Sequence, residues 1–182
     1  MDQEKDQRAS ETLEYAKDVV IQSIAETMDL YGVTPSAGKL YGTMYFSGPL
    51  NLDEMKDELK MSKPSMSTAV RTLQDISMVH KTWLKGSRKD VFVAEKNFFK
   101  SFIDFFCKKW DREVKINLES IAVAQQQLTD IMNDEEILSH LRETAQTYYT
   151  QLEESKKYYD WLTRLVASFR TGEIFDYLPI EE

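Results

Sequence analysis

The sequence predicts a mainly α-helical protein with one short two-stranded hairpin placed among its helices. Glycine and proline are scarce, at six and four of 182 residues, which favours long helices over a fold with many turns. Residues 79–93 have a composition typical of β-strands. Before and after this segment, apolar residues recur at three- and four-residue steps, which is typical of helices. Apolar side chains make up 42% of the chain, enough to build a core.

The N-terminal part predicts two helices joined by a short turn. Residues 10–31 carry apolar side chains at helical spacing, and the charged residues 1–9 before them are expected to fray. Gly32 supplies a C-terminal stop. Thr34 followed by proline is typical of an N-cap with proline at the first helical position, so a second helix is expected over residues 35–46.

Two further helices follow, separated by a tight connection. Asn51 or Asp53 can cap a helix over LDEMKDELK. Ser62 is a good N-cap for the next helix, which is expected over residues 63–77. Its apolar residues recur on one face, which leaves small polar and basic side chains on the other.

The β-type segment predicts a hairpin, with strands over residues 79–84 and 91–93. The turn KGSRKD joins them, and Gly86 can take positive φ there. Helix, short turn, helix and a hairpin with a basic tip is the order of a winged helix-turn-helix. We therefore expect residues 35–96 to form a DNA-binding domain of this class.

After Asn97 the pattern is helical almost to the end of the chain. We expect helices over residues 98–132, 134–154 and 156–170, followed by a tail with some apolar anchors. Residues 1–34 and 97–182 are more than a minimal DNA-binding unit needs. We expect them to form the N- and C-terminal parts of a dimerisation region; the alternative is a monomer whose helices only cover the core.

Charge is segregated along the chain. The whole protein carries −8, which by itself argues against a nucleic-acid partner. Residues 60–89, however, contain seven basic residues and one acidic residue, a local charge of +6, so the remainder carries −14. A basic face on an acidic body suits phosphate binding.

The helix over residues 63–77 is therefore expected to enter the major groove of double-stranded DNA. Small hydroxyl side chains allow close approach of the backbone and can bond phosphates or bases. Arg71 is the best candidate for a bidentate contact with guanine. The expected DNA-binding residues are Ser62, Lys63, Ser65, Ser67, Thr68, Arg71, Thr72, Lys85, Arg88 and Lys89.

The block MDLYGVTPSAGKLYGTMYFSGPLNLDEMKDELKMSKPSMSTAVRTLQD, residues 28–75, resembles the signature block of GbsR-type repressors, a branch related to MarR-like regulators. The likeness continues through WLKGSRKDVFVAEKNFF to about Trp110. The resemblance implies a homodimeric winged-helix repressor of genes for compatible-solute uptake or glycine betaine synthesis. It also implies a response to a choline-like quaternary ammonium ligand.

Aromatic side chains are compatible with such a ligand. A trimethylammonium group forms no ordinary hydrogen bonds and is held by aromatic faces through cation–π attraction. Plain core packing is the alternative for each ring, and Trp83 is expected to pack in the core. The rings that we expect to form a cage are Tyr41, Tyr45, Phe46, Trp110 and Trp161.

Other classes of protein have little support. The two histidines are far apart, and no HExxH, CxxC, GxSxG or phosphate-loop motif is present, so we expect no enzyme, metal site or cofactor. Cys107 cannot form an intramolecular disulfide. We find no signal peptide or apolar run of membrane-spanning length, and expect a cytoplasmic protein. The alternatives are a helical protein-interaction module and a regulator without a small-molecule ligand.

Overall fold

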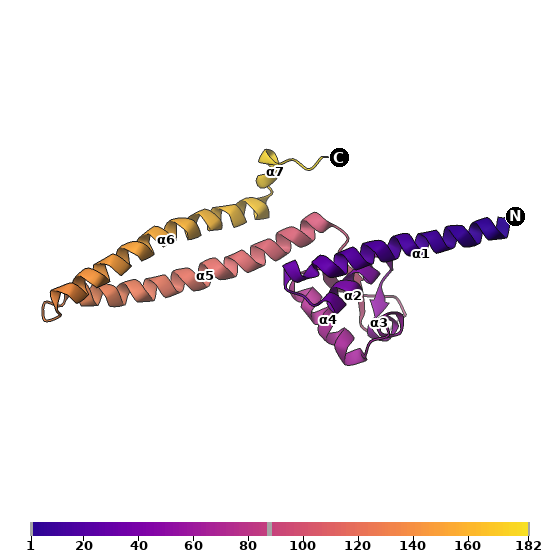
Figure 1. The fold of residues 1–182 in the computed structure, drawn as a ribbon, viewed down its shortest axis with the longest axis horizontal. Helices are drawn as coiled ribbons and strands as arrows, with labels where there is room; N and C mark the ends of the chain where they lie inside the picture. Colours follow the sequence, from indigo (N-terminus) through magenta and orange to yellow (C-terminus); the bar gives the residue numbers. More distant parts are fainter. Residues whose placement is uncertain (1, 87–88, 182) are drawn as a thin grey trace. The chain divides into compact units, whose positions relative to one another are not determined.

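A computed structural model describes residues 2–86 and 89–181 of the protein (Figure 1). The chain divides into two compact units, Met1–Phe105 and Phe106–Glu182. The predicted winged helix-turn-helix, residues 35–96, lies within the first unit, and the second unit consists mainly of two long helices. Each unit is described in turn.

The first unit begins with a long helix, α1 (Asp2–Thr27), continued by a 3₁₀ turn, η1 (Met28–Tyr31). Residues 1–9 were expected to fray, but the described part of this segment, residues 2–9, is helical. Ion pairing one helical turn apart stabilises this segment, since the Arg8 guanidinium lies 2.6 Å from the Glu4 carboxylate. Gly32 ends the turn with φ of 72°, as predicted from its freedom to adopt left-handed backbone.

Helix α2 (Pro35–Phe46) packs closely against α1. Thr34 caps it as predicted, because its hydroxyl accepts from the backbone NH of Ala37 at 3.3 Å. Gly38 allows the two helices to approach: a Cβ at this position would lie 2.9 Å from Cα of Ala25. This contact anchors only the C-terminal half of α1.

Helices α3 (Leu52–Leu59) and α4 (Lys63–Asp75) form the predicted helix-turn-helix. Asn51, not Asp53, is the N-cap of α3, and it forms a capping box with Glu54. Ser62 caps α4, accepting from the NH of Ser65 at 3.3 Å.

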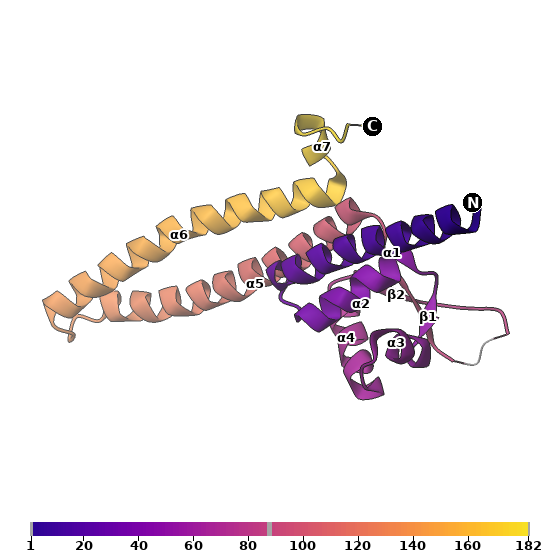
Figure 2. The same cartoon turned by 45° about the vertical axis from the view of Figure 1, so that its right-hand side comes forward.

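A small antiparallel sheet completes the first unit, in the strand order β1-β3-β2. β2 (Val79–Thr82) pairs with β3 (Val91–Ala94), and β1 (Leu50–Asn51), which was not predicted, adds to the other edge of β3. β2 ends two residues earlier than predicted. Residues 83–90 connect β2 to β3 and are called the wing; residues 83–86 and 89–90 of it are described (Figure 2).

The core of the first unit draws on every helix of the unit and on the sheet. Leu40 and Met44 of α2 meet Met55 of α3 and the buried stripe of α4. The stripe predicted for α4 is confirmed, since Met66, Ala69, Val70 and Leu73 are all buried. This packing fixes which face of α4 remains in solvent.

The second unit consists of most of α5 (Phe98–Asn133), α6 (Ser139–Thr171) and a short helix, α7 (Ile174–Tyr177). The predicted break near residue 155 was wrong, because α6 is continuous. No proline or glycine interrupts it, and pairs such as Lys156–Glu153 at 2.6 Å stabilise its middle turns. Among the described residues, no helix is long and apolar enough to span a membrane.

A few contacts hold the two long helices side by side in an antiparallel hairpin. The amide of Gln125 donates to the Glu153 carboxylate at 2.6 Å. An ion pair joins Arg170 to Asp111, and the rings of Phe106 and Phe169 lie 4.7 Å apart. Buried side chains in this unit are small in number and follow one seam, which includes Cys107 and Val166.

Candidate nucleic-acid interface

Helix α4 presents a polar and basic face to solvent. Lys63, Ser65, Thr68 and Arg71 are exposed, and Ser67 and Thr72 are half-buried. The opposite stripe is locked in the core, so rotation of α4 about its axis is prevented. These six residues are the outward-facing set that the sequence predicted for this helix.

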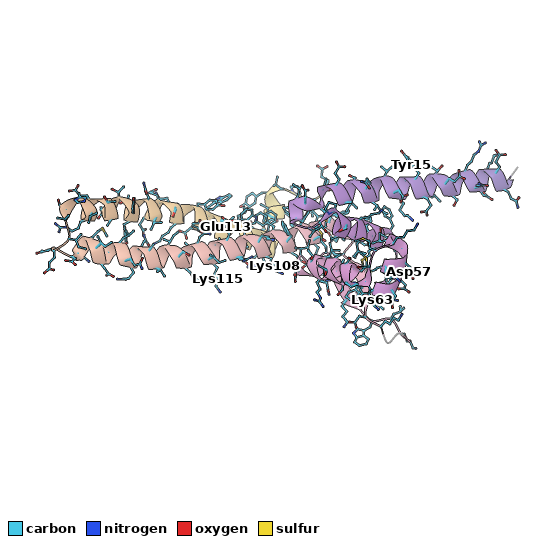
Figure 3. The ribbon with its side chains drawn as sticks, turned by 60° about the horizontal axis from the view of Figure 1, so that its bottom comes forward. Tyr15, Asp57, Lys63, Lys108, Glu113 and Lys115 are labelled. Carbon is cyan, nitrogen blue, oxygen red and sulfur yellow. The ribbon has the colours of Figure 1, made fainter. Side chains whose placement is uncertain are left out.

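The N-terminus of α4 is held by hydroxyl groups. Ser62 and Ser65 hydroxyls lie 2.8 Å apart, and Pro64 lies in the first turn. Backbone NH groups and the helix dipole favour anionic groups at this end of a helix. Figure 3 shows the Lys63 side chain here, on the opposite side of the first unit from Tyr15 of α1 in that view.

Asp53 of α3 links α4 to the wing. Its two carboxylate oxygens lie 2.7 Å from the Lys63 ammonium and 2.8 Å from the Lys89 ammonium. The hydrogen bonds from Lys63 and then Lys89 lower the pKa of Asp53 to about 2. A carboxylate therefore sits between two of the cations predicted to bind phosphate, a contact that the sequence did not reveal.

The wing carries the remaining predicted cations. Lys85 is exposed, and Lys81 at the end of β2 pairs with Asp90 at 2.7 Å. Arg88 lies outside the described residues. The expectation that Trp83 packs in the core was wrong, because 90% of its surface is exposed.

A groove runs along α4 on the side of the α2 N-terminus. It has a volume of about 540 Å³ and is lined by hydroxyl groups of both elements. Ser65, Thr68 and Thr72 come from α4, and Thr34 and Ser36 from the start of α2. The sequence identified Thr34 only as a cap; its place beside α4 depends on tertiary packing. Thr72 donates its hydroxyl proton to the Thr68 carbonyl, and the Thr34 and Ser36 hydroxyls bond each other, so Ser65 and Thr68 are the better candidates to donate to a sugar–phosphate backbone.

The aromatic residues predicted for a ligand cage fall in both units. Tyr41 is buried, its hydroxyl donates to the carbonyl of Glu95 at 2.8 Å, and burial raises its pKa to about 12. The Tyr45 ring stacks on Phe98 with centroids 5.2 Å apart and meets Phe46 edge-on at 5.3 Å. The Lys96 ammonium lies 6.0 Å from the centre of the Tyr45 ring.

The two predicted tryptophans belong to the second unit. Trp110 lies beside Phe106 at 5.8 Å, and Trp161 stacks on Tyr158 at 6.3 Å. Trp161 is half exposed. Their part in a cage stays a prediction. Within residues 2–86 and 89–181, no group of three or more His, Cys, Asp or Glu side chains could hold a metal ion.

The fold and the exposed face of α4 define a winged helix-turn-helix DNA-binding protein. Comparison with known proteins identifies the family. A family model for the C-terminal helical hairpin of GbsR family transcriptional regulators matches residues 98–176. The chain is 54% identical to the HTH-type transcriptional repressor GbsR of Bacillus subtilis (strain 168), over 93% of this chain and 94% of that protein. The chain therefore belongs to the GbsR family.

Two further comparisons were found. The HTH-type transcriptional repressor OpcR of the same organism is 31% identical, over 94% of this chain and 93% of that protein. A crystal structure of a transcriptional regulator aligns with a TM-score of 0.46 at 16% identity, over 82% of this chain and 97% of that chain. The relatives are regulators of transcription, so the prediction that the chain is not an enzyme is confirmed.

Proposed function

We propose that the protein is a homodimeric repressor whose α4 and wing bind an operator in double-stranded DNA, and whose binding is modulated by a choline-like quaternary ammonium ligand. The exposed face of α4 supports the proposed DNA binding, because the buried stripe on the opposite face keeps the hydroxyl groups and Arg71 in solvent. The identity to the GbsR repressor supports repression. The resemblance to GbsR-type repressors implies target genes for compatible-solute uptake or glycine betaine synthesis.

Two exposed apolar surfaces support the dimer. A groove of about 450 Å³ lies where α5 ends and α6 begins, lined by side chains that include Leu128, Ile131 and Tyr148. The N-terminal half of α1 exposes Leu13 and Tyr15. A dimer would carry two α4 helices, and dimeric helix-turn-helix proteins bind half-sites about one helical turn apart.

The rings around Tyr45 support a site for an organic cation. Phe98 covers one side of Tyr45, Phe46 lies at its edge, and the Lys96 ammonium already lies near the ring. A trimethylammonium group would replace this ammonium, since both are attracted by the ring quadrupole. Tyr41 would contribute indirectly. Its hydroxyl donates to the backbone carbonyl of Glu95 and so helps to hold the chain that leads to Lys96.

Repression would then depend on the separation of the two α4 helices. A ligand that prefers the conformation with mismatched spacing weakens DNA binding, with a coupling free energy of about 1–3 kcal/mol. Thermodynamic linkage requires DNA to weaken ligand binding by the same factor.

The DNA-binding part is tested with duplexes selected by the wild-type protein from a random-sequence library. Arg71→Ala should cost about 1–3 kcal/mol on the selected duplex and relax its specificity. Lys89→Ala should weaken binding to all duplexes alike and flatten the salt dependence by about one unit. Lys157→Ala, which removes an exposed cation from α6, is the matched control. Selection of no duplex by the wild type would overturn the proposal.

The ligand part is tested by calorimetric titration with choline, glycine betaine and an uncharged isostere of choline. Binding of choline should be lost with the isostere. Tyr45→Ala should weaken choline binding by about 0.5–2 kcal/mol, whereas Tyr45→Phe should retain most of it. No binding at millimolar choline would remove the ligand from the proposal and leave the DNA-binding part intact.

A further inference from the structure

An apolar pair is exposed at the base of the wing. Trp83 is 90% exposed and the adjacent Leu84 is 54% exposed. They directly follow Thr82, which forms the last residue pair of the hairpin with Val91. Val79 and Phe92 are both buried and pack into the core beneath the sheet. The Trp83 side chain is therefore not part of this core.

The two arms of the wing are held differently. The second arm is tied to the body by the Lys89–Asp53 and Lys81–Asp90 ion pairs, at 2.8 Å and 2.7 Å. Among the described residues, no ion pair, ring contact or side-chain hydrogen bond holds residues 83–86. The ladder and the two ion pairs thus fix the base of the loop and leave the indole projecting into solvent.

The charge around the indole indicates what it meets. Lys81 and Lys85 lie two residues to either side of it, and Lys89 lies on the other arm of the same loop. Lys81 and Lys89 are paired with Asp90 and Asp53, so the three lysines and two aspartates give a net charge of +1 here, which favours an anionic partner. Duplex DNA offers this combination, because apolar sugar and base edges line a groove between two rows of phosphates.

We propose that Trp83, supported by Leu84, enters the DNA minor groove beside the segment bound by α4 and acts as an apolar wedge. The proposal rests on the DNA-binding function proposed above. Apolar side chains that enter the minor groove partly unstack base steps and bend the duplex, which increases the protein surface in contact with DNA. Lys85 would contact the flanking phosphates, so the wing contributes apolar contact as well as charge.

The test uses the full-length protein and a fluorescently labelled duplex selected by the wild type from a random-sequence library. Trp83→Ala should weaken binding by about ten-fold, as loss of a buried aromatic contact predicts. Trp83→Phe should bind within about two-fold of the wild type, because a ring remains. Tyr177→Ala removes an aromatic ring of similar exposure from α7 and should leave binding unchanged. Because Trp83 makes no core contact, its substitution should leave the melting temperature unchanged.

Indole fluorescence separates contact with DNA from an indirect effect. Addition of the duplex should quench the tryptophan emission of the wild type, and this quenching should be largely lost in Trp83→Phe although that variant still binds. Wild-type affinity in Trp83→Ala would overturn the proposal while leaving DNA binding by α4 intact. Failure of the wild type to select any duplex would instead overturn the proposed function itself.

Discussion

The two units of the chain bury their apolar side chains in different ways. The first unit closes a core in which side chains from several helices and the sheet, such as Leu40, Met55 and Leu73, have no exposed surface. The second unit buries only a seam along one helix pair, with Ile121 and Leu162 as its larger members. A three-dimensional core specifies a fold by itself, whereas a two-helix seam leaves most apolar side chains in water. The first unit is therefore expected to be stable alone, and the second to need a partner.

The same substitution in each unit gives the largest contrast. Leu73→Ala removes a fully buried side chain that neighbours cannot collapse around, and should lower the free energy of unfolding of the first unit by about 4–5 kcal/mol. Leu162→Ala should cost the hairpin about 2–3 kcal/mol, because the open seam can relax around the gap. Hydrogen exchange resolved by segment measures both losses. An equal loss in the two units would contradict the proposed difference.

Dilution tests whether a second copy stabilises the hairpin. If dimerisation covers the groove beside Leu141, a hundred-fold increase in protein concentration should stabilise the hairpin by about 2–3 kcal/mol. Protection of amides in the core of the first unit should change much less. Sedimentation equilibrium over the same range reports the dimer directly. Concentration-independent protection in α6 would mean that the hairpin is stable without a partner.

The first unit was also the part that the sequence predicted best. Caps at Thr34 and Ser62, the stop at Gly32 and the apolar stripe of α4 are local signals, and the structure contains each of them. Strand β1 was missed, because two residues carry no periodicity and pairing with β3 alone defines them.

The long helices were predicted less well. We predicted a break at Ser155 between two helices, but α6 is continuous there, and the ion pairs Lys156–Glu153 and Lys157–Glu154 span that position. The candidate site shows the same limit. The outward residues of α4 follow from helical periodicity. The two ion pairs by which Asp53 joins Lys63 and Lys89, which we call the Asp53 bridge, and the neighbours of Tyr45 depend instead on distances between elements far apart in sequence.

Helix capping provides a smaller contrast. α3 has eight residues and begins with the Asn51 capping box, whereas α6 has 33 residues and begins without a side-chain cap. Asn51→Ala should destabilise the first unit by about 1 kcal/mol, since backbone NH groups of α3 lose their acceptor. Asn117→Ala, in the middle of α5, is the control and should be close to neutral. Chemical denaturation of both variants measures the difference; equal midpoints would show that α3 does not depend on its cap.

The smallest effect concerns the Asp53 bridge and its response to pH. Its folded-state pKa, about 2, lies below the ordinary value of 3.8. The ionised carboxylate thus contributes stability above about pH 4, and this contribution is lost as the pH falls toward 2. Asp53→Asn should make the free energy of unfolding less dependent on pH in this window only. The change should be small because the ion pairs are solvent-exposed. Glu153→Gln, which alters a lysine-paired carboxylate in the hairpin, is the control for acid effects outside the DNA-binding unit.

The same variant has an effect on DNA that is opposite in sign to its effect on stability. In the wild type, a phosphate that approaches Lys63 and Lys89 must compete with the Asp53 carboxylate for both ammonium groups. Asp53→Asn removes the competing charge, so binding to non-specific duplex should tighten and its salt dependence should steepen by up to about one unit. Titrations of a non-specific duplex at several salt concentrations measure the slope. A flatter slope would instead mean that Asp53 is needed to hold the two lysines toward DNA, and that the bridge positions the wing on the duplex.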